Sequence, residues 1–142
     1  MDNQKKNKNL QLINEISQLS AITDFVENLV EEWELSPGLA MSLNLVLEEA
    51  FTNVVFYAYN DEKQHVIDLN FSKNGDQLKI VLTDDGSEYD PTQKPDPDFD
   101  VPIEKRNVGG LGIFLIKKIM DTVEYQRKDN KNYLVMTKTL KL

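Results

Sequence analysis

The sequence predicts an α+β fold, in which a mixed and mostly antiparallel sheet is covered on one face by helices to form a two-layer α/β sandwich. The observation behind this prediction is a change of period along the chain. Apolar residues recur at helical spacing in the segment that ends near Tyr59, and they alternate in the shorter segments that follow. Strands joined by short turns pair as antiparallel hairpins, which leaves the preceding helices free to cover one face.

The N-terminal half predicts one strand and two helices. We expect residues 1–9 to form a flexible polar terminus and residues 10–142 to form one domain. A short strand is expected at residues 10–16, and an apolar stripe predicts a helix over residues 18–33. A second helix is expected over residues 36–59, because the Ser-Pro pair that opens this segment combines a capping residue with a proline suited to the first turn.

The C-terminal half predicts two hairpins separated by a lid and a helix. Segment 86–109 is rich in proline and has almost no periodicity, so we expect it to form a lid. A helix opened by glycines is expected over residues 109–120. The turns are expected at Asn-Gly-Asp and Asp-Asn sequences, which favour tight hairpins. The strands are expected at residues 66–71, 78–83, 123–126 and 133–140.

The composition excludes several classes of protein. The chain has 142 residues and a net charge of −8, which argues against a nucleic-acid binder and against an anionic membrane surface. It has no cysteine, so disulfides and thiolate chemistry are excluded and a reducing, cytoplasmic location is expected. We see neither an apolar run of the roughly 18 residues that a membrane span requires nor a signal peptide.

The negative charge is unevenly distributed along the chain. Residues 83–103 carry seven acidic residues and one lysine, whereas residues 104–142 carry nine basic and four acidic residues. An acidic protein of this kind can still offer a locally basic end to a phosphate group. We expect the C-terminal quarter to provide that end.

Three clusters carry the residue types that a chemical site needs. Glu49 and Asn53 are four residues apart, so they share a helix face on which a carboxylate can accept a proton and an amide can bind a hard cation. Asp84 ends a strand and is followed closely by Gly86, so its carboxylate can point into a cleft as an acceptor. Glycines at 109–112 open a helix, where a phosphate can approach free backbone N–H groups. Each cluster alone also fits a purely structural role, as a solvated helix edge, a β-turn or a glycine-rich linker.

Together and in this order, the clusters resemble the GHKL ATP-binding fold, and within it the bacterial anti-sigma factor serine kinases. Glu-Ala-Phe-Thr-Asn at 49–53 resembles the N box of that family. Asp-Asp-Gly-Ser-Glu-Tyr-Asp-Pro at 84–91 resembles its first glycine box, and the segment 109–121 resembles its second. The resemblance covers about residues 10–142 and implies the GHKL, or Bergerat, fold of a histidine kinase-like ATPase domain.

The resemblance implies a role for each matching residue. Glu49 would be the general base for the attacking hydroxyl, and Asn53 would bind the Mg²⁺ that bridges the ATP phosphates. Asp84 would accept a hydrogen bond from the adenine amino group, and Gly86 would let the base approach. An arginine and the backbone of the second glycine box would face the phosphates. These phosphate-site residues are Arg106, Gly109, Gly110, Leu111 and Gly112.

The resemblance also implies an activity and partners. It implies an ATP- and Mg²⁺-dependent serine/threonine protein kinase that acts as an anti-sigma regulatory factor. Its substrate would be a STAS-type anti-anti-sigma protein, its second partner a sigma factor, and its assembly a homodimer. Two alternatives stay open. Glu88 and the acidic segment that follows it favour a module that binds nucleotide and sequesters a partner without transfer. A detached domain that phosphorylates a histidine on another chain is the other alternative.

Overall fold

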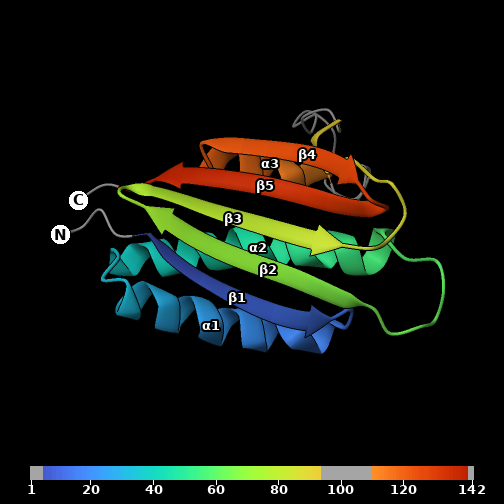
Figure 1. The fold of residues 1–142 in the computed structure, drawn as a ribbon, viewed down its shortest axis with the longest axis horizontal. Coiled ribbons are helices and arrows are strands. Elements are labelled where there is room, and N and C mark those ends of the chain that lie inside the picture. Colours follow the sequence, from blue (N-terminus) through green and yellow to red (C-terminus); the bar gives the residue numbers. More distant parts are fainter. Residues whose placement is uncertain (1–4, 94–109, 141–142) are drawn as a thin grey trace.

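The computed structural model describes residues 5–93 and 110–140, which form five strands and three α-helices. The strands lie in one sheet of order β1-β2-β3-β5-β4, and all four pairings between these strands are antiparallel (Figure 1). The predicted sandwich is therefore confirmed, with no parallel pair among the described strands. The elements are β1 (Lys6–Ile13), η1 (Ile16–Gln18), α1 (Leu19–Glu32), α2 (Pro37–Tyr57), β2 (Val66–Asn74), β3 (Gln77–Asp84), η2 (Pro91–Gln93), α3 (Gly110–Ile119), β4 (Thr122–Lys128) and β5 (Lys131–Thr139).

Strand β1 begins at Lys6, inside the segment that the sequence predicted to be flexible. It pairs with β2 along its whole length, from Lys6 opposite Lys73 to Ile13 opposite Val66. Leu12 is the one fully buried residue of the strand. An edge strand buries little, so its polar residues carry no apolar alternation from which the pairing could be predicted.

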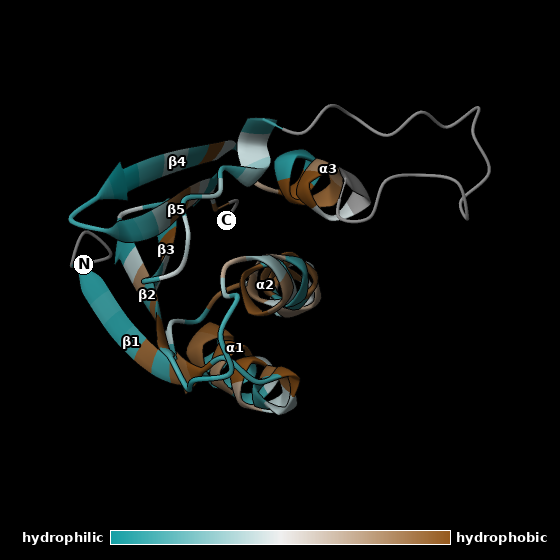
Figure 2. Cartoon of the chain, turned by 90° about the vertical axis from the view of Figure 1, so that its right-hand side faces the viewer, coloured by the Kyte–Doolittle hydropathy of each residue, from teal (hydrophilic) through white to brown (hydrophobic). Residues whose placement is uncertain are grey.

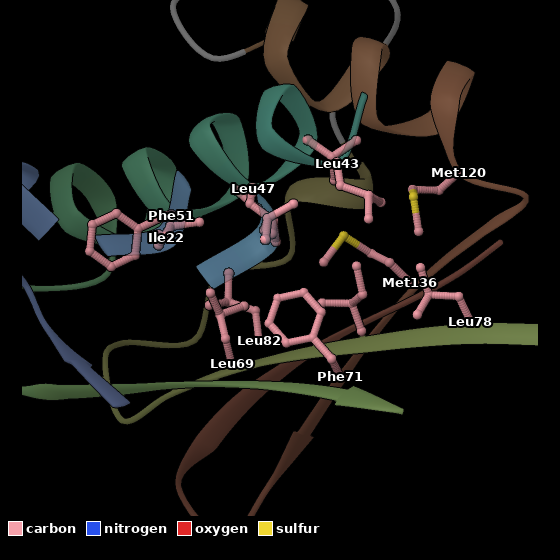
Figure 3. Close-up of a cluster of buried hydrophobic side chains, with 14 of the residues drawn as sticks. Ile22, Leu43, Leu47, Phe51, Leu69, Phe71, Leu78, Leu82, Met120 and Met136 are labelled. Atoms are coloured by element: carbon pink, nitrogen blue, oxygen red, sulfur yellow. The ribbon is translucent and has the colours of Figure 1, made fainter. Parts of the chain in front are cut away.

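All three α-helices pack on the same face of the sheet, as Figure 2 shows. The inner face of the sheet supplies every second residue of the central strands, as the two-residue period of a strand requires. Figure 3 shows these side chains meeting those of α2 in one core. The buried strand residues are Ile67, Leu69, Phe71, Leu78, Ile80, Leu82, Leu134 and Met136.

Helix α2 is the central helix of this layer. It packs against both α1 and α3, and it buries apolar residues along its length. By length and composition alone its 21 residues would suffice to cross a membrane, which departs from our expectation that no such apolar segment exists. The core helix of a soluble protein has the same properties, and the contacts of α2 with its neighbours are those of a core helix.

The turn between β4 and β5 fixes the register of the closing hairpin. Asp129 and Asn130 both have positive φ angles, of 53° and 63°. Two consecutive residues with positive φ form the type I′ turn, whose twist matches that of a two-stranded ribbon. The hairpin therefore closes tightly, and Arg127 lies directly opposite Asn132.

A substitution at Phe71 tests the assignment of the core, because its side chain is fully buried. Its ring centroid lies 5.3 Å from that of Phe25. We expect Phe71→Ala to lower the free energy of unfolding by about 3–5 kcal/mol, since it removes a large apolar side chain and leaves a cavity. Met41→Ala is the control, because Met41 is 81% exposed and its loss should cost less than about 0.5 kcal/mol. Urea denaturation measures both values, and equal losses in the two variants would contradict the assignment of the core.

Candidate functional site

A pocket lies between α2, α3 and the ends of the central strands. It contains about 430 Å³ of empty space, part of which is open to solvent. Asn53 of α2 and Asp84 of β3 both line it, so the structure brings together residues from two of the three predicted clusters. The remaining wall is mainly apolar and aromatic, which suits the flat ring of a small molecule. These other lining residues are Ala50, Val54, Ala58, Leu82, Tyr89, Pro91, Ile113, Ile116, Tyr125, Asn132 and Leu134.

Asn53 is a buried polar side chain with spare hydrogen-bonding capacity. It is 9% exposed, and it forms no side-chain hydrogen bond with any other residue of the described ranges. A buried amide normally has a partner. Within those ranges, no group of three or more His, Cys, Asp or Glu side chains could hold a metal ion. The amide oxygen of Asn53 is a ligand of the kind that Mg²⁺ accepts together with phosphate oxygens and water, so Asn53 is the residue of the pocket that could hold this ion.

Glu49 lies one helical turn before Asn53 and faces the start of α3. A Cβ atom placed on Gly112 would lie 2.6 Å from Oε2 of Glu49, so the carboxylate occupies the space that a side chain at 112 would need. Burial raises the pKa of Glu49, and the neighbouring carboxylate of Glu48 raises it further. A raised pKa is typical of a carboxylate that accepts a proton during a reaction.

Asp84 ends β3 with a carboxylate that is almost entirely buried, at 5% exposure. Its Oδ1 accepts hydrogen bonds from the backbone N–H of Gly86 and from Nδ2 of Asn132, both at 2.9 Å. Burial raises the pKa of Asp84, and these two hydrogen bonds partly oppose that effect. Both donors reach Oδ1, and no donor elsewhere in the described part of the chain reaches Oδ2.

Asn132 was missed by the sequence interpretation, although it is the residue that holds Asp84. It lies directly opposite Asp84 in the pairing of β3 with β5, and it is 5% exposed. The predicted strand began one residue later, at Tyr133, so Asn132 was left outside it. Asn132 precedes Leu134 and Met136 on the buried face of β5. An asparagine at an inward-facing position is the signal that could have found it.

Gly86 is required by the packing of the chain as well as by its predicted role beside the base. A Cβ atom at this position would lie 2.4 Å from the carbonyl oxygen of Ala58, just beyond the end of α2. The next residue, Ser87, donates its backbone N–H to that same oxygen at 2.7 Å. The glycine therefore lets the turn after β3 dock against the end of α2.

The described start of the predicted lid packs over the pocket. The ring of Tyr89 stacks on that of Tyr57 at 6.0 Å between centroids, and Pro91 is buried. Lys117 of α3 donates to the backbone carbonyl of Thr92 at 3.0 Å. The chain after β3 therefore forms one wall of the pocket.

The other predicted phosphate-site residues are only partly described. Arg106 and Gly109 lie outside the described residues, as does the rest of the lid. Gly110 and Leu111 form the first turn of α3, together with Gly112. The predicted basic phosphate end needs one correction. Arg127 belongs to the basic quarter of the chain, yet its guanidinium donates to the carbonyl of Gly86 at 2.7 Å and thus lies at the Asp84 end.

His65 forms a small cluster beside the turn that follows β3. Its Nε2 lies 2.8 Å from Oδ1 of Asp61, and its Nδ1 lies 3.3 Å from Oδ1 of Asp85. The ring stacks on Tyr59 at 4.0 Å between centroids, and the Tyr59 hydroxyl donates to Asp85. The hydrogen bond with Asp61 raises the pKa of His65, and Asp85 adds to this effect.

Comparison with known protein families identifies the family of this domain. Residues 12–138 match the model of the histidine kinase-like ATPase domain. The chain belongs to that family. The matched span includes Glu49 and Asn53 on α2, Asp84 at the end of β3 and the first turn of α3.

Several curated relatives of this ATPase domain are protein kinases by name. The chain is 30% identical over 102 residues to the serine/threonine-protein kinase BtrW of Bordetella bronchiseptica. The alignment covers 72% of this chain and 72% of BtrW. It is 37% identical over 98 residues to the serine-protein kinase RsbW of Oceanobacillus iheyensis, covering 66% of this chain and 60% of that protein. For RsbW of Bacillus subtilis the identity is 31% over 104 residues, covering 69% and 63%. The matches to RsbW thus span less than two thirds of those proteins.

A solved structure supports the fold independently. The crystal structure of the RsbU and RsbW domains of Rv1364c from Mycobacterium tuberculosis matches 95% of this chain and 32% of its own, with a TM-score of 0.69. The sequence identity is 11%, so this likeness shows the fold alone.

Gly86 provides a test of the docking between the β3 turn and α2. We expect Gly86→Ala to lower the free energy of unfolding by about 1–3 kcal/mol, because its methyl group meets backbone atoms of Ala58 that cannot move aside cheaply. Gly38→Ala is the control, since a Cβ at Gly38 meets nothing within 4 Å and alanine favours a helix. Urea denaturation of both variants checks the prediction, and an unchanged stability of Gly86→Ala would contradict it.

The raised pKa of His65 predicts that the stability of the fold depends on pH. Because folding raises the pKa of His65 above its ordinary value of about 6.5, the His65 cluster stabilises the fold fully below pH 6.5 and loses that contribution as the pH rises through the raised value. We therefore expect the stability difference between wild type and His65→Gln to be larger at pH 6 than at pH 8.5. Urea denaturation at both values measures it, and a constant difference would refute the interpretation.

Proposed function

We propose that the chain is an ATP- and Mg²⁺-dependent serine/threonine protein kinase that acts as an anti-sigma regulatory factor. The observation that carries the proposal is the placement of Asn53 and Asp84 in one pocket, with Glu49 one helical turn away against Gly112. Asp84, Asn53 and Glu49, the proposed adenine acceptor, metal ligand and proton acceptor, thus follow one another from the end of β3 to the start of α3. The kinase names of the relatives support the same activity.

Each residue has a distinct part in the proposed reaction. Asp84 accepts a hydrogen bond from the adenine amino group, and Asn53 provides an oxygen ligand for Mg²⁺ at the phosphates. Glu49 accepts the proton of a serine or threonine hydroxyl whose oxygen bonds to the γ-phosphorus, while the bond from that phosphorus to ADP breaks. Phosphoryl transfer of this kind depends mainly on positioning and on neutralisation of charge. The absence of a side chain at Gly112 leaves room for the Glu49 carboxylate beside the first turn of α3, whose backbone we propose as the phosphate site.

The partners follow from the family resemblance. We propose a STAS-type anti-anti-sigma protein as the phosphoryl acceptor, a sigma factor as the sequestered partner, and a homodimer located in the cytoplasm as the working form. The relatives named RsbW support the choice of this regulatory branch. Arg106 and Gly109 complete the proposed phosphate site from outside the described residues.

Glu49→Gln tests the proposed role of Glu49 as the general base of phosphoryl transfer. Glu48→Gln is the matched control, on the exposed side of the same helix turn. We expect Glu49→Gln to lower phosphoryl transfer from labelled ATP to a STAS protein at least about 100-fold, because the general base is lost. ATP affinity should change little, and the control should keep its activity. ATP binding by the wild type without transfer to any STAS protein would favour the alternative, a nucleotide-binding module that only sequesters its partner.

A further inference from the structure

The residues behind Asp84 form a row of polar side chains across three strands. Asp84 of β3 lies opposite Asn132 of β5, which in turn lies opposite Arg127 of β4. Side chains directly opposite one another in an antiparallel sheet lie on the same face and interact. The row therefore runs from the pocket wall to the edge of the sheet, on the side that faces the helices.

Asn132 uses its whole hydrogen-bonding capacity in this row. Its Nδ2 donates to Oδ1 of Asp84 at 2.9 Å and to the backbone carbonyl of Ser87 at 2.8 Å. Its Oδ1 accepts from the Tyr125 hydroxyl at 2.5 Å and from the Arg127 guanidinium at 3.1 Å. An amide turned by 180° would bring its oxygen against the oxygens of Asp84 and Ser87. The surroundings therefore fix which side of the amide Asp84 meets.

This orientation has a chemical consequence for Asp84. An N–H group aimed at Oδ1 favours the ionised carboxylate, and it holds that oxygen in place. Oδ2 is then left as a pure acceptor on a residue that lines the pocket. A purine with an amino group at position 6 offers a donor to such an oxygen, whereas a purine with a carbonyl at that position offers a second acceptor and is repelled.

We propose that Asn132 is a positioning residue that keeps Asp84 an acceptor, and that it thereby makes the pocket select a 6-aminopurine nucleotide over a 6-oxopurine nucleotide. The inference rests on the proposed nucleotide-binding function and adds the source of its base selectivity. Without Asn132, Asp84 would turn or take up a proton, and a protonated carboxyl can donate to a 6-carbonyl group.

The charged surroundings of Asp84 are consistent with this role. Burial raises its pKa, and Asp85, the next residue along the chain, raises it further. Arg127 from β4 lowers it, as do the hydrogen bonds from Asn132 and Gly86. Tyr59, beyond the end of α2, is held neutral because burial and the neighbouring aspartates raise its own pKa. Removal of Asn132 therefore moves the titration of Asp84 to higher pH.

The experiment compares the dissociation constants of ATP and ITP, which differ in the group at position 6, for wild type and Asn132→Leu. We expect wild type to bind ATP more tightly than ITP. In the variant, the ratio of the ITP dissociation constant to the ATP dissociation constant should fall about tenfold, because a hydrogen bond to a charged group is removed. The pH below which ATP binding is lost should also rise in the variant. Gln126→Leu, an amide-to-leucine change at an exposed position of β4, should leave both measurements unchanged.

A second variant keeps the proposal falsifiable if Asn132→Leu does not fold. Arg127 is exposed, and Arg127→Met removes one donor to Oδ1 of Asn132, so it should weaken the preference for ATP in the same direction but less. An unchanged ATP/ITP ratio in a folded Asn132→Leu, or in Arg127→Met where the first variant fails to fold, would overturn the inference.

Asp84→Ala separates this inference from the proposed function. If Asp84→Ala loses ATP affinity while Asn132→Leu keeps the wild-type ratio, the inference alone is wrong. If Asp84→Ala binds ATP as well as wild type does, the assignment of Asp84 to the adenine fails, and the inference fails with it. A wild-type protein that binds neither nucleotide would overturn both.

Discussion

The pairing of β3 with β5 is the constraint on which the rest of the structure depends. It joins the β1-β2-β3 half of the sheet to the closing β4-β5 hairpin, and the two halves have no other strand pairing in the described residues. The same register places Asp84 opposite Asn132. One set of backbone hydrogen bonds thus completes the surface on which the helices pack and also provides the partner that a buried carboxylate needs.

Helix α2 links this sheet to the proposed reaction centre. Its apolar residues, among them Leu43, Leu47 and Phe51, enter the core (Figure 3), while Glu49 and Asn53 face the side toward α3 and the pocket. A helix fixed in this way on the sheet and on two neighbouring helices offers little freedom to its polar residues. The positions of the proton acceptor and of the metal ligand are therefore set by apolar packing.

Local patterns were enough to predict the helices and the hairpins, because helical spacing, alternation and turn residues all depend on neighbouring positions. The roles of the three candidate clusters stay predictions. The edge strand β1 was predicted at residues 10–16 and thus too late in the sequence, because its pairing with β2 over Lys6–Ile13 depends on backbone hydrogen bonds rather than on apolar residues. Asn132 was missed because its role depends on the pairing of β3 with β5, which joins residues 48 positions apart. The inward-facing position of this asparagine marks it as unusual, but it does not specify which residue it contacts at that distance along the chain.

The polar row behind Asp84 shows how a site can be built at a cost to the fold. An apolar side chain at Asn132 would continue the buried face of Leu134 and Met136, and it would remove a buried amide from the sheet. That choice would leave Asp84, the carbonyl of Ser87 and the Tyr125 hydroxyl without a partner they now have. Because an unsatisfied buried group costs more than a satisfied one contributes, Asp84 and Asn132, the two buried members of the row, stabilise the fold only as a pair. The proposed ionised state of Asp84 inside the pocket therefore depends on Asn132, and this proposed role accounts for an asparagine at a position that packing alone would give to an apolar residue.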